Sequence, residues 1–323
     1  LTTPLFERAG VDAFGVATVD EGIEIRRAGA TRPILVLTGA GAKEIDAVVE
    51  HQLGVAVLDR AMVEELRASL RGRRLEVHLK IDTGMGRVGT RPDELPALFD
   101  ALRAAPELSV VGVFSHFANA DGSNEEFAAS QSRLFDQAVA LVQQAGWNPP
   151  HIHMANSAAA LTRPTSHYTM IRPGIALYGV SPMPGCPSTL RPAMRLATRI
   201  VQLKSVPAEY PLSYGQTFVT RRPSRIATLP IGYADGYDRR LSNRGSVLVR
   251  GRRAPVVGTI CMDLTLIDVT DVPGVAEHDE VVLWGDQDGA RIGVDEVAAW
   301  QRSVSYEVLT RVGKRVPRVL LGN

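Results

Sequence analysis

The feature of this chain that most constrains its fold is a regular alternation between residues 11 and 180, where short apolar runs follow amphipathic helical patterns in turn. The apolar runs have the length and composition of strands, and they lie at 12–17, 33–37, 54–58, 75–81, 109–115, 151–155 and 169–174. Stretches between them, such as 20–29, 61–72 and 130–146, have helical spacing and close on a glycine. Strands that alternate with helices pair in parallel through right-handed crossovers, so the pattern predicts an α/β domain built on a parallel sheet.

These seven predicted strands are one short of a (β/α)8 barrel of the TIM type. The chain opens on "LTTPLFERAG", which has the pattern of the last turns of a helix that ends at Gly10. We therefore expect a (β/α)8 barrel whose first strand is missing from this chain. A doubly wound open sheet is the alternative and needs no missing unit, but no glycine-rich dinucleotide fingerprint follows any strand.

The pattern changes after "SPMPGCPSTLRP", residues 181–192, a stretch rich in proline and glycine. Beyond it, β-like runs with tight polar turns dominate, and only residues 293–301 have a helical pattern. We therefore predict two domains, the barrel over residues 1–185 and a mainly β C-terminal domain over residues 186–323.

Composition limits the partners of the chain. Its 36 basic and 35 acidic side chains leave a net charge of +1, which gives no general attraction to nucleic acid or to an anionic membrane. No apolar run approaches the roughly 20 residues that span a bilayer. The two cysteines, Cys186 and Cys261, cannot form a disulfide framework, and Cys261 is expected to be a small buried core residue. Without a signal-peptide pattern at the start, a cytoplasmic location is expected.

Polar side chains collect where the predicted barrel strands end, which is where parallel barrels carry their functional residues. Four successive loops contribute them: Lys80, Asp82 and Arg87; Ser115, His116, Asn119 and Asp121; Asn156 and Ser157; Arg172, Gly174 and Ile175. Each alone has a structural explanation, because a buried arginine usually pairs with a carboxylate and Ser157 has the position of a plain helix N-cap. The conjunction of four such loops predicts an active site, without the His and Cys spacing of a metal site.

The last two of these loops predict a phosphate site. Ser157 offers a hydroxyl, and the Gly174 and Ile175 amides are expected to open a short helix whose dipole favours an anion. Arg172 would point at the group that the phosphate carries.

Tyrosines mark the second domain, where Tyr214, Tyr233, Tyr237 and Tyr306 stand beside glycine or at the ends of β-like runs. A β core does not require so many, although Tyr237 is expected to be a core residue. Asp263 has the position of a simple turn residue.

Together these segments resemble the motif series of the alanine racemases, pyridoxal-phosphate enzymes of fold type III. The matching segments occur in the family's order over nearly the whole chain: "KIDTGMGRVG", "SHFANAD", "ANSAAAL", "IRPGIALYG", "SYGQTF", "PIGYADGY", "CMD" and "SYEVLTRV". The resemblance implies a (β/α)8 barrel, a C-terminal β domain and a head-to-tail homodimer with shared active sites. It implies interconversion of L-alanine and D-alanine through a pyridoxal-phosphate aldimine, by two-base proton transfer at Cα, to supply D-alanine for bacterial cell-wall peptidoglycan.

The resemblance also implies roles for individual residues. Tyr214 would be the general base for one face of the substrate, acting in the site of the partner subunit. Arg172 would hydrogen-bond the pyridine nitrogen and leave it unprotonated, and His116 would link Arg172 to Tyr214. The remaining contacts would be Asn156, Ser157, Gly174, Ile175 and Tyr306 to the cofactor, Arg87 and Met262 to the substrate carboxylate, and Tyr233 and Asp121 at the entrance.

Lys80 would be carbamylated, as in several members of the family, and the resulting anion would position Arg87. The alternative is that Arg87 pairs with Asp82 or with Asp263.

The family's Schiff-base lysine lies on the first barrel strand, in a "VKANAYGHG"-like motif that this sequence does not contain. Because the missing strand and the missing motif coincide, we expect an N-terminal segment with this lysine, the second base, to lie outside the sequence. Two rival hypotheses remain, a non-catalytic pyridoxal-phosphate-binding relative and a barrel hydrolase or isomerase that uses His116 with Asp121.

Overall fold

The computed structural model describes residues 2–122, 124–183 and 189–321, and they form two compact units. The first unit contains the described residues up to Gly174 together with Met183. The second contains Ile175–Pro182 and the described residues from 189 onward. The predicted boundary between residues 185 and 186 lies outside the described residues, as does Cys186, and the boundary stays a prediction.

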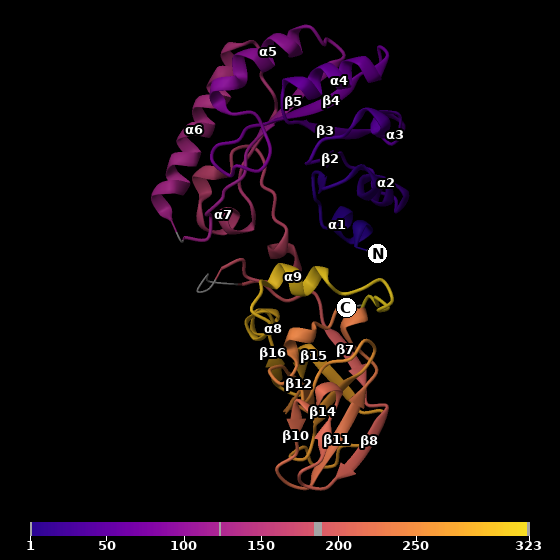
Figure 1. Cartoon of the computed structure of the whole chain (residues 1–323). Helices are drawn as coiled ribbons and strands as arrows, with labels where there is room; N and C mark the ends of the chain where they lie inside the picture. Colours follow the sequence, from indigo (N-terminus) through magenta and orange to yellow (C-terminus); the bar gives the residue numbers. More distant parts are fainter. Residues whose placement is uncertain (1, 123, 184–188, 322–323) are drawn as a thin grey trace. The chain divides into compact units, whose positions relative to one another are not determined.

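A parallel sheet organises the first unit, with six strands among the described residues that pair in the order of the sequence. It is curled, and helices cover its outer face (Figure 1). The strands are β1 (Phe14–Val16), β2 (Ile34–Val36), β3 (Leu53–Val57), β4 (Leu75–Lys80), β5 (Leu108–Phe114) and β6 (His151–His153). The helices are α1 (Thr3–Arg8), α2 (Val19–Arg27), α3 (Ile45–Glu50), α4 (Arg60–Leu70), α5 (Leu95–Arg103), α6 (Glu125–Gln144) and α7 (Ser157–Thr162). The predicted α/β fold with parallel strands of barrel type is thereby confirmed.

Local sequence explains where these helices begin and end. Asp59 caps α4 by accepting a hydrogen bond from the Met62 N–H at 2.8 Å, and Asn124 caps α6 by accepting from the Phe127 N–H at 3.0 Å. The predicted end of the first helix is confirmed, since α1 stops before Gly10, whose φ is +84°.

Alternation along the strands decides which side chains face the helices and which face the concave side of the sheet. In β4, Val77 and Leu79 are fully buried in the apolar core that includes the helix residue Leu66. His78 and Lys80 therefore point to the opposite, concave face. This face carries the polar residues of the first unit.

The segment 169–174, predicted as a seventh strand, is not a strand. Met170 makes one parallel bridge to β6, but its N–H is bound back to the carbonyl of His167 at 3.2 Å. Pro173 has no N–H to continue a ladder. The segment nevertheless follows β6 and brings Arg172 to the carboxyl end of the sheet, because the Arg172 N–H donates to a carbonyl just beyond β6 at 2.8 Å.

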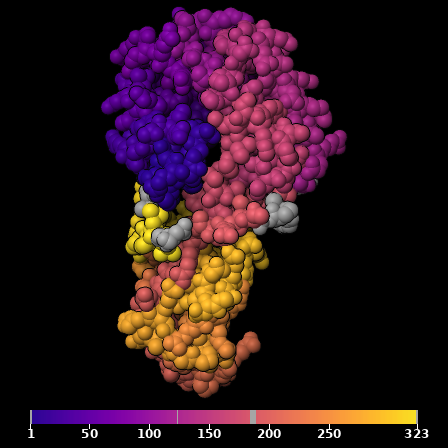
Figure 2. All heavy atoms as spheres, turned by 180° about the vertical axis from the view of Figure 1, so that it is seen from behind, coloured from indigo at the N-terminus to yellow at the C-terminus, as the bar shows by residue number. Residues whose placement is uncertain are grey.

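The outer strands of the sheet, β1 and β6, are not paired with each other in the described part of the chain. In the space-filling view from behind, a hollow separates the indigo N-terminal residues from the pink residues near 150–174 (Figure 2).

The second unit is mainly β, as predicted. Its strands are β7 (Leu196–Arg199), β8 (Gln202–Val206), β9 (Pro211–Leu212), β10 (Phe218–Val219), β11 (Ser224–Leu229), β12 (Ser246–Val249), β13 (Arg252–Pro255), β14 (Thr265–Asp268), β15 (Glu280–Gln287) and β16 (Ala290–Ile292). The antiparallel sheet β14-β11-β8 packs with a second sheet, β13-β12-β15-β16, in which β7 pairs with β15. Tyr237 is buried in the core as expected.

Two expectations for this unit were wrong. Besides α8 (Val294–Trp300), its described residues contain the helix α9 (Ser305–Thr310), which at six residues is too short to show a clear helical period. Cys261 is only half-buried. It lies in a loop, where its Sγ is 3.6 Å from the Ser213 Oγ. None of the helices in the described ranges is long and apolar enough to cross a membrane.

Candidate active site

Lys80 ends β4 on the concave face, with only 5% of its surface exposed. Its Nζ lies 4.6 Å from the centroid of the Phe114 ring. Gly89 packs against the stem of this lysine, where a Cβ would lie 2.8 Å from the Lys80 Cγ, so the turn after the strand requires glycine. Burial, helped by the charges of Arg172 and Arg87, lowers the pKa of Lys80 to about 7.

Arg87 is exposed and makes no ion pair with Asp82 among the described residues of the first unit. The Asp82 carboxylate instead accepts hydrogen bonds from the N–H groups of Gly84 and Gly86, at 2.9 and 3.0 Å, which close the loop after β4. Asp263, in the second unit, pairs with Arg315 at 2.6 Å and is therefore more than a turn residue.

Arg172 is held by neutral acceptors. Its Nη1 lies 2.7 Å from the His153 Nδ1, its Nη2 donates to the Ser115 carbonyl at 2.7 Å, and the same Nη2 lies 3.3 Å from the His116 Nδ1. Burial lowers the pKa of Arg172 to about 10, which leaves the guanidinium protonated at neutral pH. Arg172 thereby connects its own segment to the loops after β5 and β6, which makes three of the four loops predicted to carry polar site residues.

His116 is neutral in this environment. Burial, followed by the charges of Arg172 and Lys80, lowers its pKa to about 3. Because Arg172 can only donate, the His116 Nδ1 must accept, and the single hydrogen of the neutral imidazole lies on Nε2. A base with so low a pKa is weak, which disfavours the hydrolase hypothesis for His116.

Gln131 fixes the loop that carries His116, and sequence reasoning missed it. It is fully buried in α6, its Oε1 accepts from the Ala118 N–H at 2.9 Å, and its Nε2 donates to the His116 carbonyl at 3.2 Å. A signal was present, because Gln131 lies on the apolar face of α6 at helical spacing from Ala128 and Phe135.

Ser157 and Gly174 join the two loops predicted to bind phosphate. The Ser157 Oγ accepts a hydrogen bond from the Gly174 N–H at 2.8 Å. The N-cap of α7 is Asn156, whose Oδ1 accepts from the Ala159 N–H at 3.1 Å, so the alternative explanation of Ser157 as a plain N-cap does not hold. As predicted, Ile175 opens a short 3-10 helix, Ile175–Tyr178.

Tyr214 is the most exposed of the predicted tyrosines in the second unit, with 73% of its surface accessible. Its turn is strained, since φ is positive at Ser213, Gly215 and Gln216, with values of 60°, 71° and 49°. Strain of this kind is found at functional sites. A hydrogen bond of 2.9 Å from the Thr259 Oγ1 to the Tyr214 carbonyl holds the turn.

Tyr233 and Met262 come from two motifs that pack backbone against backbone. The Tyr233 N–H donates to the Cys261 carbonyl at 3.1 Å. A Cβ on Gly232 would lie 2.3 Å from the carbonyl oxygens of both Cys261 and Met262, so only glycine allows this approach. Thr259, which supports Tyr214, lies in the same loop.

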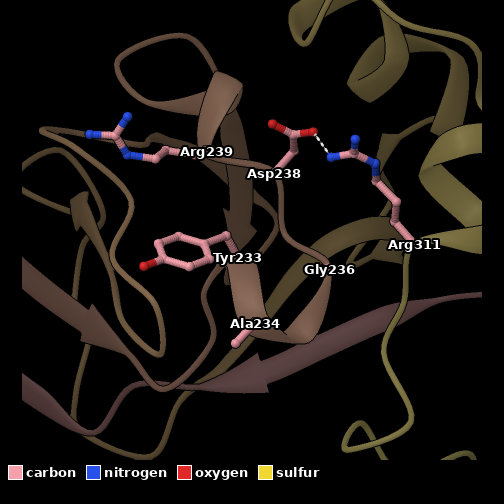
Figure 3. Close-up of a pocket in the computed structure, with 6 residues that line it drawn as sticks. All are labelled: Tyr233, Ala234, Gly236, Asp238, Arg239 and Arg311. Atoms are coloured by element: carbon pink, nitrogen blue, oxygen red, sulfur yellow. Dashed lines mark hydrogen bonds and ion pairs between the residues drawn. The ribbon is translucent and has the colours of Figure 1, made fainter.

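A pocket of about 660 Å³ lies beside Tyr233, lined also by Ala234, Gly236, Asp238, Arg239 and Arg311. Figure 3 shows the Asp238 carboxylate paired with Arg311, while the Tyr233 and Arg239 side chains lie on the other side of the pocket. Sequence reasoning missed these charged residues, although the "YDRR" segment carries two of them. Tyr306, on α9, and Asp121, in the first unit, are both exposed.

The predicted residues thus form one group in each unit. The first brings together Lys80, His116, Ser157, Arg172 and Gly174 at the carboxyl end of the parallel sheet. The second brings together Tyr214, Tyr233 and Met262 around residues 259–262.

Known proteins match this chain over nearly its whole length. The family model "Alanine racemase, N-terminal domain" matches residues 2–182, and the model "Alanine racemase, C-terminal domain" matches residues 193–320. The alanine racemase of Geobacter sulfurreducens is 44% identical over 323 residues, covering 98% of this chain and 85% of its own. Alanine racemase 2 of Caldanaerobacter subterraneus is 42% identical over 317 residues, covering 97% of this chain and 82% of its own.

Solved structures give the same result. The alanine racemase of Bacillus anthracis with bound L-Ala-P has a TM-score of 0.92 at 36% identity, covering 98% of this chain and 83% of its own. The alanine racemase of D-cycloserine-producing Streptomyces lavendulae has a TM-score of 0.93 at 36% identity, covering 98% of this chain and 85% of its own.

Proposed function

Because this chain belongs to the alanine racemase family of pyridoxal-phosphate-dependent isomerases, we propose that it interconverts L-alanine and D-alanine with pyridoxal phosphate as its cofactor. The observation that carries the proposal is Arg172, a protonated guanidinium surrounded by imidazoles and carbonyls at the carboxyl end of the sheet. We further propose that the enzyme works as a cytoplasmic homodimer and supplies D-alanine for cell-wall peptidoglycan.

The donors present fit the ring of the cofactor. The Nη1 and Nη2 groups of Arg172 are engaged, whereas its Nε–H has no acceptor among the described residues. We assign this N–H to the pyridine nitrogen, and a guanidinium that keeps its proton leaves that nitrogen unprotonated. When bound, pyridoxal phosphate supplies an electron sink that acidifies the Cα–H, and an unprotonated ring is the weaker sink that favours return of the proton to Cα.

The loops after β6 fit the phosphate. Ser157 offers its hydroxyl, and Asn156 fixes the start of α7. The Gly174 N–H, which donates to the Ser157 Oγ at 2.8 Å, would turn to the phosphate when the cofactor binds. A Cβ on Gly174 would meet no atom of the chain within 4 Å, so internal packing does not require glycine there, whereas close approach of a ligand would. The Ile175 amide and Tyr306 complete the set of phosphate contacts that we propose.

Tyr214 is the base that we propose for one face of the substrate, and it acts in the site of a second copy of the chain. Its high exposure and strained turn are consistent with a residue that must reach a partner's site. His116, with its hydrogen on Nε2, donates to the phenolate oxygen of Tyr214 and stabilises the deprotonated base. Arg172 fixes this tautomer through the His116 Nδ1.

Lys80 has the properties that carbamylation requires. A pKa of about 7 leaves a large neutral fraction of the amine at physiological pH, and only the neutral amine reacts with carbon dioxide. The carbamate would position Arg87, which would bind the substrate carboxylate together with the Met262 amide. Tyr233 and Asp121 would line the entrance.

Racemisation by the Tyr214→Phe variant tests the proposal. The protein is expressed from its complete gene, and the rates from L-alanine and from D-alanine are measured by circular dichroism. Loss of the base should lower kcat by about 10²- to 10⁴-fold. The control is Tyr210→Phe, another exposed tyrosine of the second unit, which should keep the wild-type rate. A Tyr214→Phe enzyme as fast as the wild type in both directions would contradict the assignment.

A further inference from the structure

The side chain of His78 fits in the sheet only because the residue opposite it in β5 is a glycine. It lies on the concave face in β4 with 8% of its surface exposed. The pairing of β4 with β5 shifts register between Val77 and His78. A Cβ on Gly112, the residue opposite in β5, would lie 2.0 Å from the His78 Nδ1. Glycine weakens a strand interior, so its presence here indicates close approach of the imidazole.

A chain of hydrogen bonds connects His78 to Arg172. The His78 Nδ1 lies 2.9 Å from the His153 Nε2, and the His153 Nδ1 lies 2.7 Å from the Arg172 Nη1. Both imidazoles are buried, and the His153 ring stacks on Phe114 with the centroids 4.9 Å apart. Because both rings are buried, these hydrogen bonds are shielded from solvent.

The direction of each bond follows from the arginine, which can donate and never accept. His153 must therefore accept at Nδ1, and a neutral imidazole then carries its hydrogen on Nε2. That N–H points at the His78 Nδ1, which must accept in turn. A protonated His153 is excluded, because its Nδ1–H would face the Nη1 hydrogens of Arg172.

We propose that His78 is a positioning residue for Arg172, because it accepts the Nε2–H of His153 and so holds the imidazole that orients the guanidinium. The inference rests on the proposed function to the extent that Arg172 meets the cofactor. Burial lowers the pKa of His78 to about 3 and that of His153 well below its ordinary range, so both rings stay neutral. Neutral acceptors orient the guanidinium without neutralising its charge, which a carboxylate would do.

Without an acceptor at position 78, the Nε2–H of His153 is buried and unpaired, because Arg172 still requires the Nδ1 to accept. The ring then loses the bond that holds it in place, and with it the fixed position of the acceptor that orients Arg172. The imidazole of His151 is a suitable comparison. It stacks on His78 with the centroids 5.7 Å apart, and it has no hydrogen-bonded place in the chain from His78 to Arg172.

The experiment compares wild type, His78→Leu, His78→Asn and His151→Asn, each labelled with 15N-histidine and loaded with pyridoxal phosphate. Long-range 1H–15N correlation spectra report the tautomer of His153 directly, without substrate. The wild type, His78→Asn and His151→Asn should show the Nε2–H tautomer, because in His78→Asn the amide oxygen of the introduced side chain takes the place of the imidazole Nδ1. In His78→Leu the Nε2–H of His153 has no acceptor, so its proton signal should move upfield and broaden by exchange with solvent.

Kinetics give the second readout. We expect His78→Leu to lower kcat about tenfold with an unchanged KM for alanine, the usual scale when a residue that orients a site is removed. The His78→Asn and His151→Asn enzymes should stay within about threefold of wild type. An Nδ1–H or cationic His153 in the wild type, or a His78→Leu enzyme with wild-type kcat, would overturn the proposal. A wild type without racemase activity would refute the proposed function alone, since the spectra still decide the tautomer.

Discussion

Substitution of Gly112 by alanine tests the packing on which the concave face depends. Gly112 lies in the interior of β5, and a Cβ there would be 2.0 Å from the Nδ1 and 2.4 Å from the Cε1 of His78. Contacts of a Cβ below 3.0 Å essentially do not occur, so the imidazole must move. Because His78 lies against the neighbouring strand and bonds to His153, its movement breaks that hydrogen bond.

The expected loss of stability follows from opposing terms. Alanine in place of glycine normally stabilises by about 0.4 to 1 kcal/mol, because the unfolded chain has fewer conformations. Overpacking costs about 1 to 3 kcal/mol, and the lost hydrogen bond about 1 kcal/mol. We therefore expect Gly112→Ala to lower the free energy of unfolding by about 2 kcal/mol.

A double-mutant cycle isolates the clash. In a His78→Ala background the space is open, and Gly112→Ala should be neutral or stabilising by about 0.5 kcal/mol. Urea unfolding followed by far-UV circular dichroism measures the four proteins. Gly54→Ala is the matched control, because Gly54 lies inside β3, the next strand beyond β4, and a Cβ there would meet nothing closer than 3.7 Å. An equal loss from Gly112→Ala with and without His78 would refute the reasoning.

Three further predictions concern Lys80, Gln131 and Asp238. Between pH 7 and 10.5 only the unfolded chain keeps the Lys80 proton, so the free energy of unfolding should rise with pH across this window in buffer without carbon dioxide. Urea titration at several pH values measures the rise, and Lys80→Met should flatten it. Gln131→Leu leaves an N–H and a carbonyl of the His116 loop unsatisfied, and should cost about 2 kcal/mol by urea titration and lower kcat. Asp238→Asn removes a buried carboxylate that pairs with Arg240 and Arg311, so it should lower the free energy of unfolding by about 2 kcal/mol at neutral pH. An unchanged unfolding midpoint would show that these ion pairs do not stabilise the second unit.

Much of the first unit was predictable because parallel strands are buried on both faces and stand out as apolar runs. The rule that function lies at the carboxyl ends of such strands then predicted Lys80, His116 and Arg172 as candidate site residues. The seventh strand was wrong for a reason that composition does not show, since the Met170 N–H bonds locally to His167.

The residues that were missed in the first unit lie inside strands and helices, and the strand-end rule does not examine them. His78 and His153 interrupt apolar strands at positions that face the concave side, and this periodicity was available as a signal. Gln131 likewise lies on the apolar face of a helix. The contact between Gly112 and His78 could not be predicted from any local pattern, because it depends on a register shift between β4 and β5.

The most direct test of the central claim, that this chain is a pyridoxal-phosphate-dependent alanine racemase, is borohydride reduction of the protein expressed from its complete gene. Racemisation of L-alanine and the intact denatured mass are measured before and after treatment. The account predicts that reduction abolishes racemisation and adds one phosphopyridoxyl group to the mass. A protein that keeps racemising alanine after reduction, with its mass unchanged, would contradict it.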